Sequence, residues 1–561
     1  MKLSKGCGRA LVHVALWGLG ATVCVAAEGT GKAASIPTAR SAVESGLIGL
    51  FPATDFRLVQ GACADCAAPR QALWYFQDDF VAVPRKGVDS VGYDLGVLPK
   101  AAVQRWHAAA TPRELQARPA MVWIGSPEVV EGARLLPTGG RLRLADGSTA
   151  GFGVVPKLPT NRSYYNEATQ QFFQQRPLRI RGRVEAAPAG AMLVARTVWP
   201  EDYVIDAQRA KLVPLANGEQ IDQLVRQAGD YETRLLWERN PGQPRDWSKL
   251  SALGLMLNGA QGDDDEAHGG HFGIVTGRLG PRGEWAEWLV NNFYNLDSHS
   301  EKGIVAAMVP MDNYLMDLNS GQSYYRPSYM LVALLRDDRA AYAYQAAIAR
   351  VFNHFYRHDF RYRHAGANCA GISMDTLRAL GWQVPVRGPT SYAKAAVAYP
   401  YMAIKEGSLD SGRQAFDYLR EERTRLYPAV AFDAAGMDLL RLATGSVDGR
   451  ALSAYERMLA EDLEAIVFVR IPQIPSSRAA GQFPVASIDE YMKRAPEDKS
   501  KWQIVPVEPR PFPQEFISAD TEAERLGHAG LGLAGVLLLG GVMGIACGWR
   551  AMRRRSARLR H

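Results

Sequence analysis

The feature that most restricts how this chain can fold is an apolar stretch near its C-terminus, residues 526–549. It reads LGHAGLGLAGVLLLGGVMGIACGW and carries no Asp, Glu, Lys or Arg. A helix rising about 1.5 Å per residue would cross a bilayer core of about 30 Å with this length, so we expect a transmembrane helix. The arginine-rich tail that follows, residues 550–561, is expected in the cytoplasm by the positive-inside rule. We therefore expect a single-pass protein of the cell membrane with most of its chain on the periplasmic, extracytoplasmic side.

Residues 1–27 have the features of a secretory signal peptide. Basic residues precede an apolar run, and small residues suit cleavage before Glu28. A lipoprotein signal is the alternative because Cys24 lies near this boundary, but the preceding residues ATV lack the expected Leu and the small residue just before the cysteine. The body of the chain is therefore predicted to fold in an oxidising compartment.

The charge balance restricts the partners. The net charge is +7, but the predicted signal peptide and tail contribute nine of the 65 basic residues and none of the 58 acidic ones, which leaves the body slightly acidic. It has no basic stripe of the kind that nucleic-acid binding needs, so no nucleic-acid partner is expected. Within the apolar stretch, small residues recur as Gly540, Gly544 and Gly548, a spacing that would let two such helices pack closely in a homodimer.

Three of the six cysteines fall within residues 1–27 or 526–549, which leaves Cys63, Cys66 and Cys369. Cys63 and Cys66 are close enough in CADC to form a disulfide in an oxidising compartment. A redox-active pair is less expected, because CADC precedes a strand pattern instead of opening a helix after a strand. A zinc site would need a second such pair, which the chain does not have, and we predict no metal or cofactor. Cys369 remains without a predicted partner, either as a buried apolar residue or as a reactive thiol.

The body is long enough for two domains. Residues 28–215 are predicted to be a β-rich domain, because short alternating runs recur between Gly and Pro clusters, at 73–84, 120–125, 140–155, 177–186 and 191–199. Residues 216–470 are predicted to form an α+β domain, with helical stretches at 219–238 and 337–358 and a strand pair between them. The Pro-rich, charged residues 471–525 are predicted to form a partly extended stalk.

Cys369 is predicted to open a helix. Asn368 is a suitable N-cap, apolar residues follow at helical spacing, and Gly381 stands where the helix would stop. Unpaired N–H groups and the dipole at a helix start favour an anion, so we expect a lowered thiol pKa at Cys369. The same N–H groups, next to Asn368, could form half of an oxyanion hole.

A base for this thiol is expected on a hairpin around the turn GPRG, residues 280–283. If paired residues sum to 563, His271 faces Asn292, and a loop of odd length would bring Asn291 or Phe293 opposite instead. A histidine oriented by an asparagine on the next strand is the arrangement that fixes an imidazole tautomer in Cys-His-Asn hydrolases. His268 is an alternative base. The acidic run at 263–266 matches no EF-hand or zinc signature and is interpreted as a solvated loop.

The order of a His-bearing strand, HFGIVTG, before the helix-opening NC resembles circularly permuted papain-like folds, among them the NlpC/P60-related group. The stretches NNFYNLD and YRHAGANCAGISMDTLRALGW are similar to the DUF4105 family, which includes the N-terminal periplasmic domain of the lipoprotein acyltransferase Lnb. The resemblance implies acyl transfer by Cys369 and His271. It covers residues 250–385, and the β-rich N-terminal region and the single C-terminal membrane helix depart from the family.

Together these features predict an α+β, permuted papain-like domain preceded by a β-rich domain. The expected function is that of a membrane-tethered cysteine hydrolase or acyltransferase that acts on an ester or amide, with a membrane lipid or lipoprotein as substrate. One alternative is a cell-wall peptidase or amidase. The other is a noncatalytic envelope scaffold in which Cys369 is an ordinary core residue. A serine hydrolase is disfavoured because the sequence has no G-x-S-x-G motif.

Overall fold

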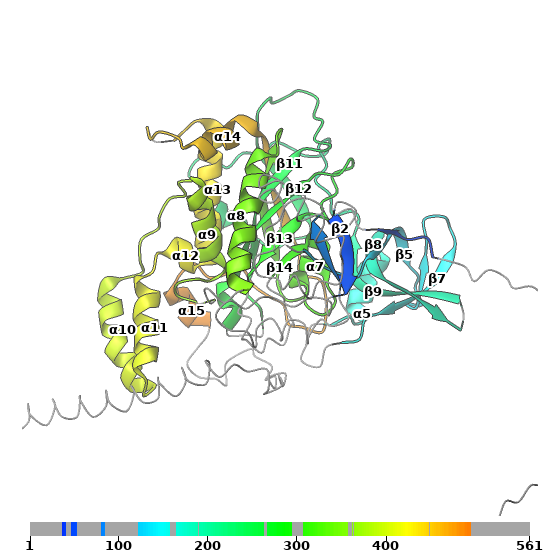
Figure 1. The fold of residues 1–561 in the computed structure, drawn as a ribbon, viewed down its shortest axis with the longest axis horizontal. Helices are drawn as coiled ribbons and strands as arrows, with labels where there is room; N and C mark the ends of the chain where they lie inside the picture. Colours follow the sequence, from blue (N-terminus) through cyan, green and yellow to red (C-terminus); the bar gives the residue numbers. More distant parts are fainter. Residues whose placement is uncertain are drawn as a thin grey trace, which may run out of the picture. The chain divides into compact units, whose positions relative to one another are not determined.

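The structure is a computed structural model, and all the residues that it describes belong to one compact unit that begins at Ile36 (Figure 1). The described residues are 36–40, 47–52, 80–84, 122–157, 164–188, 190–262, 266–293, 307–356, 362, 364–447 and 449–494.

The centre of this unit is a ten-stranded sheet in which neighbouring strands are antiparallel except for one parallel pair, β14 with β4. Two adjacent strands in its interior are SALGLMLN and SYMLVALL, and every residue of both is buried. Such continuous burial is expected of strands that are covered on both faces. The strands in spatial order are β10 (Glu232–Glu238), β16 (Leu463–Ile471), β15 (Ser328–Leu335), β11 (Ser251–Asn258), β12 (His271–Arg278), β13 (Leu289–Asn292), β14 (Ala307–Pro310), β4 (Val122–Gly125), β3 (Phe80–Pro84) and β2 (Leu47–Pro52).

A second sheet closes on itself through a pairing between β5 and β8. Buried ion pairs attach it to the main sheet through the short helix α7 (Met311–Met316): the Nε of Arg181 donates to Oδ2 of Asp312 at 2.8 Å. Removing one partner of such a buried pair would strongly destabilise the folded protein, because the other charge would stay buried without compensation. The strands in spatial order are β1 (Ala39–Arg40), β5 (Glu128–Leu135), β6 (Arg141–Arg143), β7 (Thr149–Val154), β9 (Gly190–Pro200) and β8 (Leu178–Ala187).

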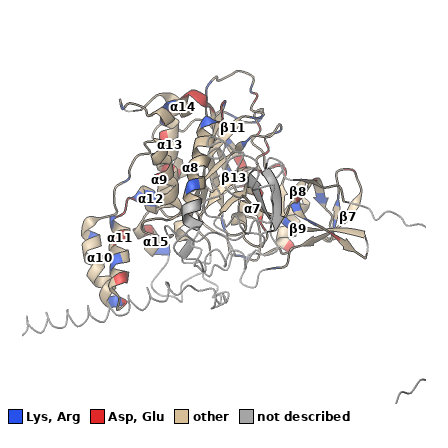
Figure 2. Cartoon of the chain, in the orientation of Figure 1, with Lys and Arg blue, Asp and Glu red and all other residues tan. Residues whose placement is uncertain are grey.

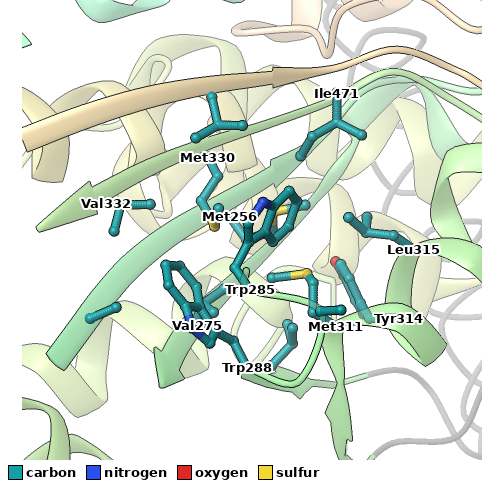
Figure 3. Packing of buried hydrophobic residues seen from close by; sticks show 14 of the residues in the cluster. Met256, Val275, Trp285, Trp288, Met311, Tyr314, Leu315, Met330, Val332 and Ile471 are labelled. Atoms are coloured by element: carbon teal, nitrogen blue, oxygen red, sulfur yellow. The ribbon is translucent and has the colours of Figure 1, made fainter. Parts of the chain in front are cut away.

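Helices α8 (Arg339–Tyr356), α9 (Cys369–Leu380) and α13 (Pro428–Thr444) pack against β11 and β12 (Figure 1). A cluster around Trp285, Trp288, Met256 and Met330 also packs on the main sheet (Figure 3). A Cβ at Gly277 would lie 2.2 Å from Cδ1 of Trp288, so only glycine lets this tryptophan lie on β12. The remaining helices are α5 (Glu167–Gln174), α6 (Ile221–Leu224), α10 (Tyr392–Lys405), α11 (Leu409–Arg420), α12 (Arg423–Leu426), α14 (Ala454–Asp462), α15 (Ile488–Arg494) and the 3₁₀ turns η2 (Glu266–Gly269) and η3 (Gln322–Tyr324).

The predicted strands between residues 120 and 199 are confirmed as β4 and β6 to β9, and the predicted helix at 337–358 is confirmed as α8. The helical prediction for 219–238 is largely wrong, because only α6 is helical and β10 occupies the rest. Pairing with β16 buries Leu235 and Leu236, and this tertiary contact outweighs the local helical preference.

The predicted boundary at residue 215 does not divide the sheets, because β2, β3 and β4 extend the sheet formed by later strands. The predicted stalk is wrong for its first part. Residues 471–494 pack on the body, with Ile474 and Val485 fully buried and Gln482 paired with Ala260. Apolar side chains and backbone hydrogen bonds thus hold a segment whose proline content suggested an extended linker.

Several predicted features lie outside the described residues. They are residues 495–525, the predicted transmembrane helix, the tail, the predicted signal peptide, and Cys63 and Cys66. Within the described part of the chain, none of the helices combines the length and apolar character needed to span a bilayer.

Candidate active site

Cys369 is the first residue of α9, as the sequence predicts, and it is a buried thiol. Asn368 caps the helix: its side-chain oxygen accepts a hydrogen bond from the Gly371 N–H at 2.7 Å. Its Nδ2 donates to the backbone oxygens of His364 and Leu426, at 3.0 and 3.1 Å. These bonds fix the start of the helix, and with it the position of the thiol.

The thiol lies where β12 and β13 separate. Their ladder pairs Val275 with Val290 and Thr276 with Leu289, and it does not continue toward the start of β12. There the Ile274 N–H donates to Oδ1 of Asn291 at 2.6 Å. The backbone N–H of Phe272 is close enough to the Cys369 sulfur to lower the pKa of the thiol. The opening of the sheet therefore brings the thiol beside the residue that follows His271.

His271 forms a side-chain hydrogen bond with Asn292, the partner that the sequence predicts. The predicted register is nevertheless wrong, because the observed pairs place Gly273, not His271, level with Asn292. The chain turns at Gly280 as expected, but residues 284–288 make a further turn around Trp285, so β13 begins only at Leu289. His271 thus reaches Asn292 diagonally along one face of the sheet.

Asn291, the alternative orienting residue, has a different set of contacts. Its Oδ1 accepts from Ile274 and from the Tyr344 hydroxyl at 2.9 Å, and its Nδ2 donates to Oγ of Ser373 at 3.3 Å. It thereby connects β12 and β13 with α8 and α9. We assign it a structural role, which leaves Asn292 as the partner of the imidazole.

Burial raises the pKa of the Cys369 thiol above its ordinary value, even though hydrogen bonds from Phe272 and Tyr362 and the charge of Arg326 lower it. The expected lowering of the thiol pKa at the helix start is therefore wrong, because loss of solvent outweighs these contributions. Burial also lowers the pKa of His271 to about 3, with the charge of Arg326 acting in the same direction and the bond to Asn292 opposing it. Thiol and imidazole are both uncharged at neutral pH.

Two residues of this site were missed by sequence reasoning. Arg326 is buried after η3 and donates from Nε to Oε1 of Gln322 at 2.9 Å and from Nη1 to the backbone oxygen of Gly259 at 3.2 Å. Its charge acts on both Cys369 and His271. The hydroxyl of Tyr362 accepts a hydrogen bond from the Cys369 N–H at 3.4 Å. No motif marks Arg326, whereas Tyr362 opens the stretch that resembles DUF4105.

Polar side chains continue from His271 across the end of the sheet. His271 pairs with Asn258 in the ladder, and Asn258 pairs with Ser328 on β15. The Nδ2 of Asn258 donates to Oγ of Ser328 at 2.8 Å, and the Tyr314 hydroxyl donates to Oδ1 of Asn258. These buried groups satisfy one another's hydrogen bonds and hold the first residue of β12 in place.

The alternative base, His268, packs edge-on against Tyr491 of α15, with ring centres 5.9 Å apart. The backbone oxygen of His268 accepts from the Val485 N–H at 2.9 Å. These contacts give it a packing role between η2 and the C-terminal segment. Residues 263–265 of the acidic run are not described, and the described residues contain no group of three His, Cys, Asp or Glu side chains suited to a metal ion.

Comparisons with protein-family models, with curated proteins and with solved structures give no match to this chain. The resemblance to the DUF4105 family and to permuted papain-like folds stays a prediction.

Proposed function

We propose that this protein is a membrane-tethered cysteine hydrolase or acyltransferase of the cell envelope, with a permuted papain-like catalytic domain. The observation that carries the proposal is that the Phe272 backbone N–H acts on the Cys369 thiol, and that the preceding residue, His271, is hydrogen-bonded to Asn292. A cysteine at a helix start, a histidine at a strand start and an orienting amide are the groups that thiol acyl transfer requires.

In the proposed reaction His271 accepts the thiol proton and the Cys369 sulfur attacks the carbonyl carbon of an ester or amide. The Cys369 N–H exchanges its bond to the Tyr362 hydroxyl for one to the developing oxyanion, and His271 returns the proton to the departing alcohol or amine. Water or an amine then attacks the thioester and releases the acyl group. Because both groups start uncharged, the proton transfer accompanies the attack of the sulfur on the carbonyl carbon and does not precede it.

The proposed lipid substrate rests on the predicted membrane tether and on the family resemblance. Purified full-length protein should release or transfer acyl groups from labelled phospholipid, and Cys369→Ser should abolish this activity. Turnover of labelled muropeptide in place of phospholipid would favour a cell-wall peptidase or amidase. Activity on neither substrate would count against both enzyme classes.

The burial and raised thiol pKa of Cys369 favour a second candidate, a noncatalytic envelope scaffold. A small buried residue in a packed core meets the same description. This candidate predicts that Cys369→Ser preserves function in cells, whereas the enzyme proposal predicts its loss.

A further inference from the structure

Helices α10 and α11 lie between α9 and α12 in the sequence and pack against each other as a hairpin (Figure 1). Their caps are well formed: Ser391 Oγ accepts from the Lys394 N–H at 3.1 Å, and Ser408 Oγ accepts from the Ser411 N–H at 3.4 Å. The helices approach closely, because a Cβ at Gly412 would lie 2.5 Å from the Tyr399 backbone oxygen. The hairpin is therefore a defined element with its own internal packing.

The composition of α10 is unusual for a surface helix. Its sequence, YAKAAVAYPYMAIK, is apolar around the whole circumference, with Lys394 and Lys405 as its charged residues. Figure 2 shows it mostly tan, whereas α11 carries acidic and basic side chains in the ordinary amphipathic way. A helix that is apolar on all sides is normally covered on all sides by protein or by lipid.

Only one face of α10 has a cover among the described residues. That face packs on α11, where Ala395 is buried and the Tyr399 ring meets Phe416 at 6.2 Å. The opposite face exposes Val397 by 69%, Tyr401 by 57% and Ile404 by 75%. These three residues and the exposed Ala393 and Pro400 follow the spacing of a single helix face.

The position of α10 in the chain indicates what covers this face. Lys394 Nζ lies 3.2 Å from Oδ1 of Asp489 on α15, which ends at Arg494, so α10 stands beside the point from which the chain continues toward residues 526–549. The two lysines stand at opposite ends of the helix, and Lys405 Nζ lies 5.9 Å from the Tyr401 ring centre. Apolar residues with a tyrosine and flanking lysines suit the boundary between acyl chains and anionic headgroups.

We propose that the outer face of α10 binds the surface of the lipid bilayer, with Val397, Tyr401 and Ile404 inserted at the boundary between headgroups and acyl chains. This inference rests on the proposed membrane tether and not on the chemistry of Cys369. The hairpin joins the site through α12: Asn368 Nδ2 donates to the Leu426 oxygen, and Arg378 Nη1 donates to Oε2 of Glu422 at 3.1 Å. Docking through α10 would thus hold the helix that carries Cys369 at a constant orientation to the lipid.

The test is photocrosslinking of the full-length chain in vesicles of phosphatidylcholine and phosphatidylglycerol. Ile404→p-benzoylphenylalanine places the probe on the outer face of α10, and Gln414→p-benzoylphenylalanine places a matched control at an exposed position of α11. Intact-mass measurement should find phospholipid adducts about tenfold more often at position 404 than at 414. Adding Val397→Asp to the 404 probe should reduce these adducts at least about fivefold.

Equal or absent lipid adducts at the two positions would overturn the proposal. So would a crosslink from position 404 to a second copy of the chain, or to residues 495–525 of the same chain. Measuring Cys369 acylation on the same samples separates the two proposals. Acylation without lipid adducts at position 404 would refute only the membrane-binding face. Lipid adducts without acylation would refute only the proposed enzyme activity.

Discussion

Cys369 and His271 are both buried, and the charge of Arg326 acts on both. Burial raises the pKa of the thiol and lowers that of the imidazole, and the positive charge of Arg326 favours thiolate while disfavouring imidazolium. At the sulfur, the charge of Arg326 therefore opposes the effect of burial on the pKa. At the imidazole ring it shifts the pKa in the same direction as burial. The resting site holds a neutral pair, in contrast to the ion pair of many thiol enzymes.

Alkylation by iodoacetamide tests the state of the thiol. Because the thiolate reacts and its pKa is raised, labelling of Cys369 should be slow at pH 7 and should rise with a midpoint above the ordinary value of about 8.5. Arg326→Gln should move the midpoint further upward, and Arg326→Lys should restore it in part. A midpoint below 8.5 in the native protein would contradict the neutral resting pair.

The depressed pKa of His271 predicts a loss of stability in acid. The unfolded chain binds a proton on this imidazole below about pH 6.5, whereas the folded protein does so only near pH 3. Stability from the neutral ring is therefore complete above pH 6.5 and is lost as the pH falls, by about 2 kcal/mol at pH 5. In thermal unfolding at pH 7 and pH 5, His271→Gln should lose less stability than the native protein, and an equal loss would refute the assignment.

The sequence predicted that Cys369 opens a helix, because a helix cap is a local signal, and it offered Asn292 as a partner of His271, although from a register that is wrong. It could not reveal Arg326, whose importance comes from the folding of η3 beside two distant residues. It also misjudged the thiol pKa, since the degree of burial at the helix start depends on packing from other parts of the chain.

At the scale of elements, α9 depends on its cap more than an ordinary surface helix does. Asn368→Ala removes the Gly371 cap and the bonds to His364 and Leu426, and we expect a loss of about 1–2 kcal/mol together with slower Cys369 acylation. Ser391→Ala removes a comparable cap from exposed α10 and serves as the control, with acylation unchanged. Equal effects of the two substitutions on acylation would show that the cap does not position the thiol.

The two neighbouring asparagines of β13 should separate into structural and functional roles. Asn291→Ala breaks contacts to β12, α8 and α9, so unfolding measurements should show a loss of about 1–3 kcal/mol. Asn292→Ala should cost less stability but should reduce the acyl-transfer rate about a hundredfold, because the imidazole loses its orienting bond. The opposite division would reassign the orienting residue to Asn291.

The predicted elements were most accurate where the pattern was local. The limits of α9 follow from Asn368 and Gly381, and the latter has a φ of 107° that suits glycine. The register of β12 and β13 was wrong because residues 284–288 form an extra turn in which Trp285 enters the core. No local rule distinguishes that turn from a continuing strand.

At the scale of the whole molecule, the segment after β16 packs against the chain near the site. Gln482 and Ala260 exchange backbone hydrogen bonds of 2.7 and 2.9 Å, and Arg478 Nη2 donates to Oε1 of Gln261 at 3.0 Å. The segment thus holds the chain just before His271. Proline content alone could not distinguish this packed segment from a stalk, because its partners lie more than two hundred residues earlier in the sequence.

Gly481→Ala tests how tightly this segment packs. A Cβ there would lie 2.5 Å from the Ala260 oxygen and 2.8 Å from the Arg326 Cα, and both are backbone atoms that cannot easily move. We expect a loss of about 1–3 kcal/mol and increased proteolysis near residue 480. Gly388→Ala is the matched control, since no atom lies within 4 Å of its added Cβ. An unaffected Gly481→Ala protein would show that the segment is not tightly held.

The most direct test of the central claim is to trap the acyl-enzyme. Full-length protein is incubated with p-nitrophenyl acyl esters, and intact-mass and peptide mass spectrometry locate the acyl group. We predict a hydroxylamine-sensitive thioester on Cys369 in the native protein, and its loss in both Cys369→Ser and His271→Ala. Acylation that is absent from folded protein and appears at Cys369 only after denaturation would contradict the account, and Cys369 would then be an ordinary core residue.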